Sequence, residues 1–158
     1  MNTMQFVQAP LMLVLLLYFL TPNAQAQSSA GVKVTPSQIK WNDNPVLPKG
    51  AKATTILGDA MKPGPFVVRV KLPANAKVMA HAHPIDHEIT VLSGTLYYAE
   101  GDKFDAKKLK AFPAQSFLVE PAKVPHFLAA KREVVIQVNG TGPSGFDYVD
   151  PKDFPQKK

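Results

Sequence analysis

Fifteen prolines and nine glycines divide this chain of 158 residues into short segments. Several of these segments are apolar or β-branched runs, such as 66–71, 88–92 and 133–139. Runs of this length between turn residues are typical of β-strands, and no stretch has the pattern of a long amphipathic helix. We therefore expect an all-β fold, either an antiparallel sandwich or a barrel.

The connections between these runs give two more specific expectations. The runs 88–92 and 95–99 are joined by Ser93-Gly94, which is typical of a hairpin with a tight turn. Asp105 is placed to cap one short surface helix ending near Leu109. The other runs expected to form strands are 39–41, 54–57, 78–83, 116–119, 124–128 and 146–149.

The first 26 residues resemble a signal peptide. Residues 11–20 are an apolar block, which is followed by a helix-breaking segment that ends in Ala24-Gln25-Ala26. A block of ten residues is too short to span a bilayer, which needs about 20. We therefore expect export to the periplasm or the medium after cleavage at Ala26. No Lys or Arg precedes the block, so an uncleaved anchor remains the alternative.

The remainder is long enough for one domain. We expect a flexible lead over 27–38, a β-barrel domain over 39–150 and a flexible tail over 151–158. The chain has no cysteine, which excludes disulfides and thiolate ligands. Its net charge of +6 is spread over many lysines without a basic stripe. This pattern predicts a solvated cationic surface and no nucleic-acid partner.

The histidines carry the strongest functional signal. Three of the four lie within 81–88, and the fourth, His126, follows a later apolar run. Side chains at i and i+2 of a strand share a face, so His81 and His83 should point the same way, together with Met79. Neutral imidazole is the commonest protein ligand for transition metals, so the cluster predicts a metal site.

Two motifs resemble those of the cupin superfamily, in particular its small quercetin-dioxygenase-like members. The first is His-Ala-His-Pro-Ile-Asp-His-Glu-Ile-Thr-Val-Leu-Ser-Gly over 81–94, and the second runs from Gln115 through Pro121 to Pro125-His126. The resemblance implies a jelly-roll β-barrel. It also implies a divalent metal inside the barrel, held by two histidines and a glutamate of the first motif and one histidine of the second. His81, His83 and His126 match the histidine positions.

The position of the family's glutamate is contested in this chain. His87 satisfies the family spacing, four residues after His83 and seven before Gly94, and Glu88 comes one residue late. Strand alternation agrees, because a strand with His87 facing inward also turns Ile89 inward and Glu88 outward. We favour a site of four histidines, and a one-residue bulge would restore Glu88 as the ligand.

The second motif departs from the family at Lys123, where the family usually has glycine. Glycine at such a position permits a turn with positive φ. We therefore expect a strained or reshaped loop before His126.

A site of nitrogen ligands suits Fe, Mn, Zn, Ni or Cu better than Mg or Ca. The resemblance leaves the activity open, and our first hypothesis is a metal-dependent, dioxygenase-like enzyme acting on a small hydroxylated or enolic molecule, with Glu88 as the candidate base. The alternative is a non-catalytic cupin that binds or senses a metal or small ligand. A small molecule is the expected partner, no membrane span is expected after cleavage, and free strand edges are compatible with a homodimer.

Overall fold

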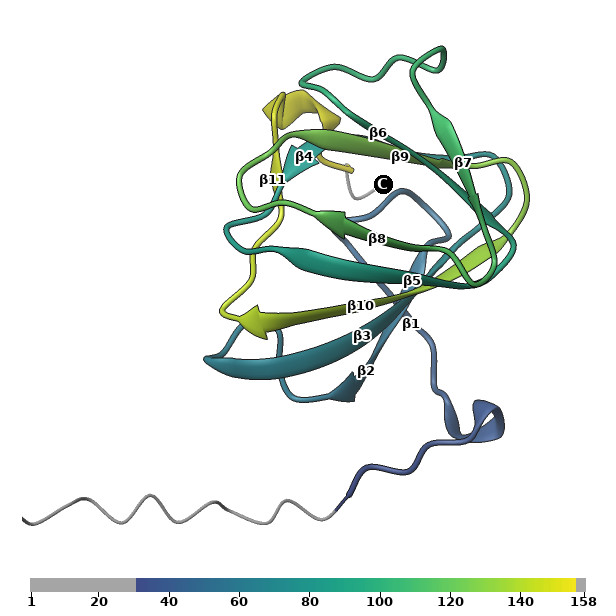
Figure 1. Ribbon diagram of the computed structural model, residues 1–158, viewed down its shortest axis with the longest axis vertical. Coiled ribbons are helices and arrows are strands. Elements are labelled where there is room, and N and C mark those ends of the chain that lie inside the picture. The colour runs from purple at the N-terminus through teal and green to yellow at the C-terminus, as the bar shows by residue number, and fades with distance from the viewer. Residues whose placement is uncertain (1–30, 156–158) are drawn as a thin grey trace, which may run out of the picture. The chain divides into compact units, whose positions relative to one another are not determined.

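The computed structural model describes residues 31–155, which form two antiparallel sheets (Figure 1). The first sheet has six strands and the second has five. The predicted signal peptide, the start of the lead and the last three residues lie outside the described residues. In spatial order the first sheet comprises β1 (Asn42–Asp43), β2 (Lys52–Leu57), β3 (Gly64–Leu72), β10 (Val134–Gly142), β5 (His87–Ser93) and β8 (Phe117–Glu120). The second comprises β11 (Asp147–Tyr148), β4 (Ala76–Ala82), β9 (His126–Ala130), β6 (Thr95–Glu100) and β7 (Lys110–Pro113).

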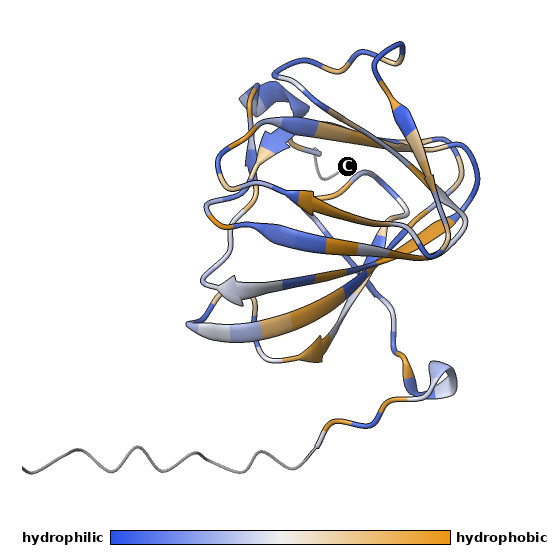
Figure 2. Cartoon of the chain, viewed as in Figure 1, coloured by the Kyte–Doolittle hydropathy of each residue, from blue (hydrophilic) through white to orange (hydrophobic). Residues whose placement is uncertain are grey.

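The core lies between the inner faces of these sheets. Side chains of a strand alternate between its faces, so buried and exposed residues alternate, as in β8, where Leu118 and Glu120 are buried and Phe117 and Val119 are exposed. Figure 2 shows the corresponding bands of apolar and polar residues along the strands. The largest fully buried apolar side chains are Phe127, Leu72, Ile89, Leu96, Val78, Val91 and Val134.

This arrangement confirms the expected all-β jelly roll. Within residues 31–155, strand pairing occurs inside each sheet and does not join the two sheets into a closed barrel. The described part also has two single turns of 3-10 helix, Pro36–Gln38 and Pro151–Asp153. It contains no helix that is long and apolar enough to cross a membrane.

One local expectation was wrong. The chain does not form a hairpin at Ser93-Gly94, because β5 belongs to the six-stranded sheet and β6 to the five-stranded one. Gly94 makes this sheet-to-sheet turn with φ of 76°, and a Cβ there would lie 2.4 Å from the carbonyl oxygen of Glu133. At Asp105 the expected short element is a single turn. The Asp105 carboxylate accepts from the amide of Lys107 at 2.9 Å, its carbonyl accepts from the amide of Lys108 at 3.1 Å, and β7 follows at once.

A bulge in β4 sets the direction of the first two histidines. Val78 pairs with Leu128 and His81 pairs with His126, so β4 spans three positions where β9 spans two. The extra residue reverses the alternation, and Val78 and His81 therefore face the same interior. Met79, expected to share the face of His81, falls within the bulge and is only partly buried.

Candidate metal centre

Two directly opposed strand pairs bring four polar side chains together inside the fold. His81 of β4 faces His126 of β9 in the five-stranded sheet. His87 of β5 faces Glu120 of β8 in the six-stranded sheet. Opposed residues of antiparallel strands project from the same face, so each sheet contributes one pair to the interior. All four side chains are buried.

His83 lies between the two pairs, on the connection that carries the chain from β4 to β5. It is buried, and its Nε2 lies 3.7 Å from Oε2 of Glu120. His87 Nδ1 lies 3.6 Å from the same oxygen, and His126 Nε2 lies 3.4 Å from Oε1. The carboxylate of Glu120 is thus surrounded by three imidazoles.

Backbone carbonyls fix the tautomers of three histidines. Nδ1–H donates to Met79 O at 2.7 Å in His81, to Gly145 O at 2.6 Å in His83 and to Val124 O at 3.0 Å in His126. A carbonyl oxygen can only accept, so Nδ1 carries the proton when the ring is neutral. Each Nε2 then keeps a free lone pair, which is the arrangement of a metal-binding histidine held by an outer hydrogen bond.

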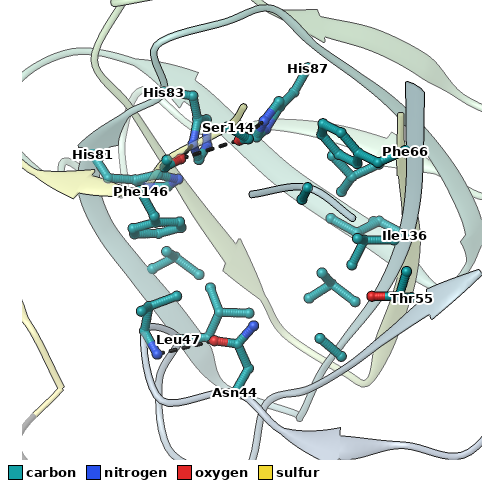
Figure 3. Close-up of a pocket in the computed structure, with 18 of the residues that line it drawn as sticks. Asn44, Leu47, Thr55, Phe66, His81, His83, His87, Ile136, Ser144 and Phe146 are labelled. Carbon is teal, nitrogen blue, oxygen red and sulfur yellow. Dashed lines mark hydrogen bonds between the residues drawn. The ribbon is translucent and has the colours of Figure 1, made fainter. Parts of the chain in front are cut away.

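His87 has the opposite orientation. Its Nε2 lies 2.8 Å from Oγ of Ser144, whose hydroxyl donates to the Gly145 carbonyl at 3.5 Å. With that hydroxyl proton engaged, Oγ accepts from Nε2–H, and Nδ1 of His87 keeps its lone pair beside Glu120. The loop after β10 therefore orients both His83 and His87, as Figure 3 shows for Ser144.

Two atoms at the centre have no hydrogen-bond partner among the described residues. They are Oε1 of Glu120 and Nε2 of His126, both fully buried. When the imidazole is neutral, these atoms are two acceptors 3.4 Å apart. Two buried acceptors this close are unfavourable unless a proton or a cation lies between them. Ligand atoms about 2.1 Å from one metal ion lie at most about 4.2 Å apart. The Glu120 distances satisfy this limit, so the residues present fit a transition metal.

Two overlapping sets of three residues could hold such an ion. His81, His83 and His126 form one, and His83, His87 and Glu120 form the other, with the ligand atoms of each set within 4.8 Å of one another. His83 belongs to both sets. The whole group of four histidines and Glu120 is called the metal centre below.

Burial keeps His81 and His83 neutral in the metal-free chain. Desolvation, reinforced by His126, lowers the pKa of His81 to about 3. Desolvation together with His87 lowers the pKa of His83 to about 4. Metal ligation requires neutral imidazole, so both rings are in the required state at neutral pH.

Glu120 and His126 form a mutually stabilised pair. Burial opposes ionisation of Glu120, but the adjacent imidazoles of His126, His87 and His83 outweigh it and lower the pKa of the carboxyl group. Burial likewise opposes protonation of His126, and the adjacent Glu120 outweighs it and raises the pKa of the ring. Glu120 is therefore an anion at neutral pH, and a bound cation would take the place of the proton on His126.

The predicted site residues divide into two groups. His81, His83, His87 and His126 meet in the metal centre, whereas Glu88 is exposed on the opposite face of β5. The bulge that would have turned Glu88 inward is absent from the start of β5, where the register with β8 is regular from His87 onward. Glu88 instead lines a separate hollow with Asp86 and Asn139. The preference for His87 over Glu88 agrees with these positions.

Glu120 is the residue that sequence reasoning missed. The strand expected over 116–119 ended one residue too early, because β8 extends to Glu120 and buries it to 2% exposure. The alternation of Phe117, Leu118, Val119 and Glu120 was the available signal. A strand that turns Leu118 inward also turns Glu120 inward.

A cavity of about 420 Å³ opens beside the metal centre. His81, His83, His87 and Glu120 line one end of it, and Ser144 and Phe146 lie next to them. Phe146 stacks on the His81 ring at 4.1 Å between centroids. Figure 3 shows the histidines at one end and Asn44 and Leu47 at the other. A small molecule in this cavity would contact the metal centre directly.

The fold and the centre define a small cupin with a site fitted for a transition metal. The chain belongs to the ChrR cupin-like domain family, whose profile matches residues 29–144. No curated protein matches it by sequence.

Solved structures agree on the fold. The polyketide cyclase RemF from Streptomyces resistomycificus has a TM-score of 0.63 at 16% identity, covering 78% of this chain and 88% of that one. An RmlC-like cupin from Shewanella frigidimarina has a TM-score of 0.54 at 16% identity, covering 77% and 93%. Salicylate 1,2-dioxygenase from Pseudoaminobacter salicylatoxidans, with gentisate, has a TM-score of 0.51 at 14% identity, covering 62% and 29%. At these identities the similarity shows a shared fold.

Proposed function

We propose that this protein is an exported metalloenzyme of oxygenase type, which binds one divalent transition metal and acts on a small hydroxylated or enolic molecule. The observation that carries the proposal is the position of the metal centre, which forms the end wall of a largely apolar cavity. A structural metal site is usually closed by its ligands, whereas a catalytic site keeps a position open to substrate. Here the cavity reaches the ligands themselves.

The chain's own groups have separate roles in this proposal. The four imidazoles hold the ion, and the carbonyls of Met79, Gly145 and Val124 keep three of them in the ligating tautomer. Glu120 supplies the negative charge, and it replaces Glu88 as the carboxylate that can accept a proton from a bound hydroxyl group. Apolar side chains form most of the cavity wall and would contact the bound molecule.

When bound, a transition metal at such a site polarises oxygen ligands and provides for reaction with dioxygen. The structural neighbours include a polyketide cyclase and a dioxygenase solved with gentisate, and both names are consistent with oxygen-bearing organic substrates. Iron and manganese are the metals that best suit a redox role with mixed nitrogen and carboxylate ligands, and zinc, nickel and copper also fit the donor set.

Oxygen uptake by the reconstituted protein tests the proposal. Protein loaded separately with Fe(II), Mn(II), Ni(II), Cu(II) and Zn(II) should consume oxygen with at least one phenolic or enolic compound of a panel, and only with a redox-active ion. Glu120→Gln should lose this activity, and Glu88→Gln should keep it. Metal-loaded protein that consumes no oxygen with any compound would contradict the oxygenase role.

One observation favours a second function, that of a non-catalytic metal-binding or sensing cupin. Five donor groups surround the centre, which is more than the three protein ligands of a typical catalytic zinc site. If all five bind one ion, little room remains for substrate. Ligand-field spectra of the cobalt-substituted protein distinguish the two functions, because only a site with an open position changes its spectrum when an oxygen chelator is added.

Export also belongs to the proposal and rests on residues 1–26. Cleavage after Ala26 would leave Gln27 as the first residue. Mass spectrometry of the protein recovered from outside the cytoplasm should find this terminus. A chain retained at full length in the membrane fraction would support the alternative of an uncleaved anchor.

A further inference from the structure

The described residues that line the cavity include no lysine or arginine. The chain contains 18 lysines and arginines, and none of them lines the cavity within the described residues. We propose that the bound molecule is a neutral compound, with two adjacent oxygen donors at one end and an uncharged body that fills the rest of the cavity. Catechols, α-hydroxyketones and β-dicarbonyls belong to this class. The inference rests on the proposed function and specifies the substrate class of the same site.

The middle of the cavity is a continuous apolar surface built from both sheets. The inner faces of β3, β5 and β10 provide one wall, and β4 and β9 provide the other. The backbone amides of these strands are engaged in sheet hydrogen bonds, so they are not free to bind an anion. The side chains that form this surface are Phe66, Val68, Val70, Leu72, Ile89, Ile136, Val138, Val78 and Leu128.

The end opposite the histidines offers neutral polar groups (Figure 3). Oδ1 of Asn44 accepts a hydrogen bond from the amide of Val46 at 3.0 Å, which fixes the orientation of the side-chain amide. Its Nδ2 has no hydrogen-bond partner among the described residues, so it can donate to a carbonyl or hydroxyl oxygen of the bound molecule. The Thr55 hydroxyl group lines the same region.

Among the described residues, the charged groups near this end form an ion pair that leaves no unpaired cation at the cavity wall. Asp43 is the acidic residue that lines it, and its carboxylate is paired with Lys52 at 2.9 Å. Lys52 is therefore engaged outside the cavity wall. A carboxylate held against the apolar middle of the cavity would lose its water and find no cation in exchange, which is strongly unfavourable. A carboxylate that itself binds the metal would escape this penalty, so a test must place it at the far end of the molecule.

Calorimetric binding to the zinc-loaded protein provides this test without requiring turnover. The probes are 3,4-dihydroxyphenylacetate and its amide, which share the catechol group and differ in charge at the opposite end. At pH 7 the acid is ionised. We expect the amide to bind at least tenfold more tightly, which is a conservative figure for burying an unpaired carboxylate. Equal or tighter binding of the acid would overturn this inference and leave the metal centre intact. If neither compound bound, the inference and the proposed function would fail together.

A cation introduced into the wall should reverse the selectivity. Thr55→Lys places an ammonium group in the cavity, and it should reduce or invert the preference for the amide. Thr90→Lys adds the same charge on β5 at a residue that does not line the cavity, and it should leave the preference unchanged. Asn44→Lys introduces the cation instead if Thr55→Lys does not fold. An unaltered preference in a folded cavity variant would contradict the proposal.

Discussion

Glu120 determines the chemistry of the metal centre at the scale of single residues. It is the only carboxylate among the five donor groups of the centre, and it contacts three of the four imidazoles. Without it, a divalent ion and four neutral histidines would bring two uncompensated positive charges into the interior, which is unfavourable. The buried carboxylate thus offsets half of the charge of the ion.

Substitution of Glu120 should weaken metal binding. Glu120→Gln keeps the size of the side chain but removes the charge, and we expect metal affinity to fall by at least about tenfold. Glu88→Gln is the matched control, because it makes the same change on the exposed face of β5. Titration with zinc in competition with a chromophoric chelator measures both. Equal losses in the two variants would show that Glu120 has no special role.

The histidines were predicted from the sequence, and the carboxylate was missed. The spacing of His81, His83 and His87 from Gly94 carries the information, because alternation along a strand depends only on local sequence. Glu120 reaches the centre through its pairing with His87 across two strands, which is a tertiary contact. A proline immediately after it also concealed the end of β8.

At the scale of elements, the two irregular features of the strands position the site. The bulge in β4 turns His81 inward, and the turn at Gly94 moves the chain between sheets instead of closing a hairpin. The strand runs themselves followed from apolar patterning. The bulge in β4 and the change of sheet at Gly94 did not follow from this patterning. The same local sequence is compatible with a regular strand and with a hairpin, and only long-range strand pairing decides which structure forms.

The loop from β8 to β9 also has an irregular feature, the backbone conformation of Lys123, and its strain can be tested. Lys123 adopts φ of 63°, as expected from the glycine usual in the family at this position, and its amide donates to the His83 carbonyl at 2.7 Å. A left-handed conformation costs a non-glycine residue about 1–2 kcal/mol, and the greater entropy of unfolded glycine offsets part of the gain. Lys123→Gly should therefore raise the free energy of unfolding by up to about 1 kcal/mol.

The neighbouring Ala122 provides the control for this change. Its φ is not positive, so Ala122→Gly should lower the free energy of unfolding by about 0.5–1 kcal/mol. Urea denaturation of the two variants measures both changes. If both glycines destabilised the protein to the same extent, the conformation of Lys123 would not be strained.

At the scale of the whole molecule, the buried histidines should make the metal-free protein sensitive to acid. In the unfolded chain His81 and His83 take up protons near pH 6.5, whereas in the fold their pKa values are about 3 and about 4. At pH values between the unfolded and the folded pKa values, the unfolded state binds more protons than the folded state. The free energy of unfolding therefore falls as the pH is lowered. Stabilisation from the lowered pKa of Glu120 is also lost in acid.

His126 acts in the opposite direction, because its raised pKa contributes stability below pH 6.5 that is lost as the pH rises through the higher value. The metal-free protein should melt at progressively lower temperature between pH 6.5 and pH 4, because the contribution of His126 is already complete below pH 6.5 and His81 and His83 therefore dominate the pH dependence in this range. A His81→Gln, His83→Gln double variant should show a shallower dependence. Parallel curves for the two proteins would contradict the assignment of neutral, buried rings.

The whole account depends on the buried cluster being a metal site, which elemental analysis of the purified protein tests most directly. We predict close to one first-row transition metal per chain in the native protein, and almost none in a His81→Ala, His83→Ala double variant that retains its β-sheet circular dichroism. Native protein that contained no metal, and that took up none on reconstitution with iron, manganese, nickel, copper or zinc, would contradict the central claim.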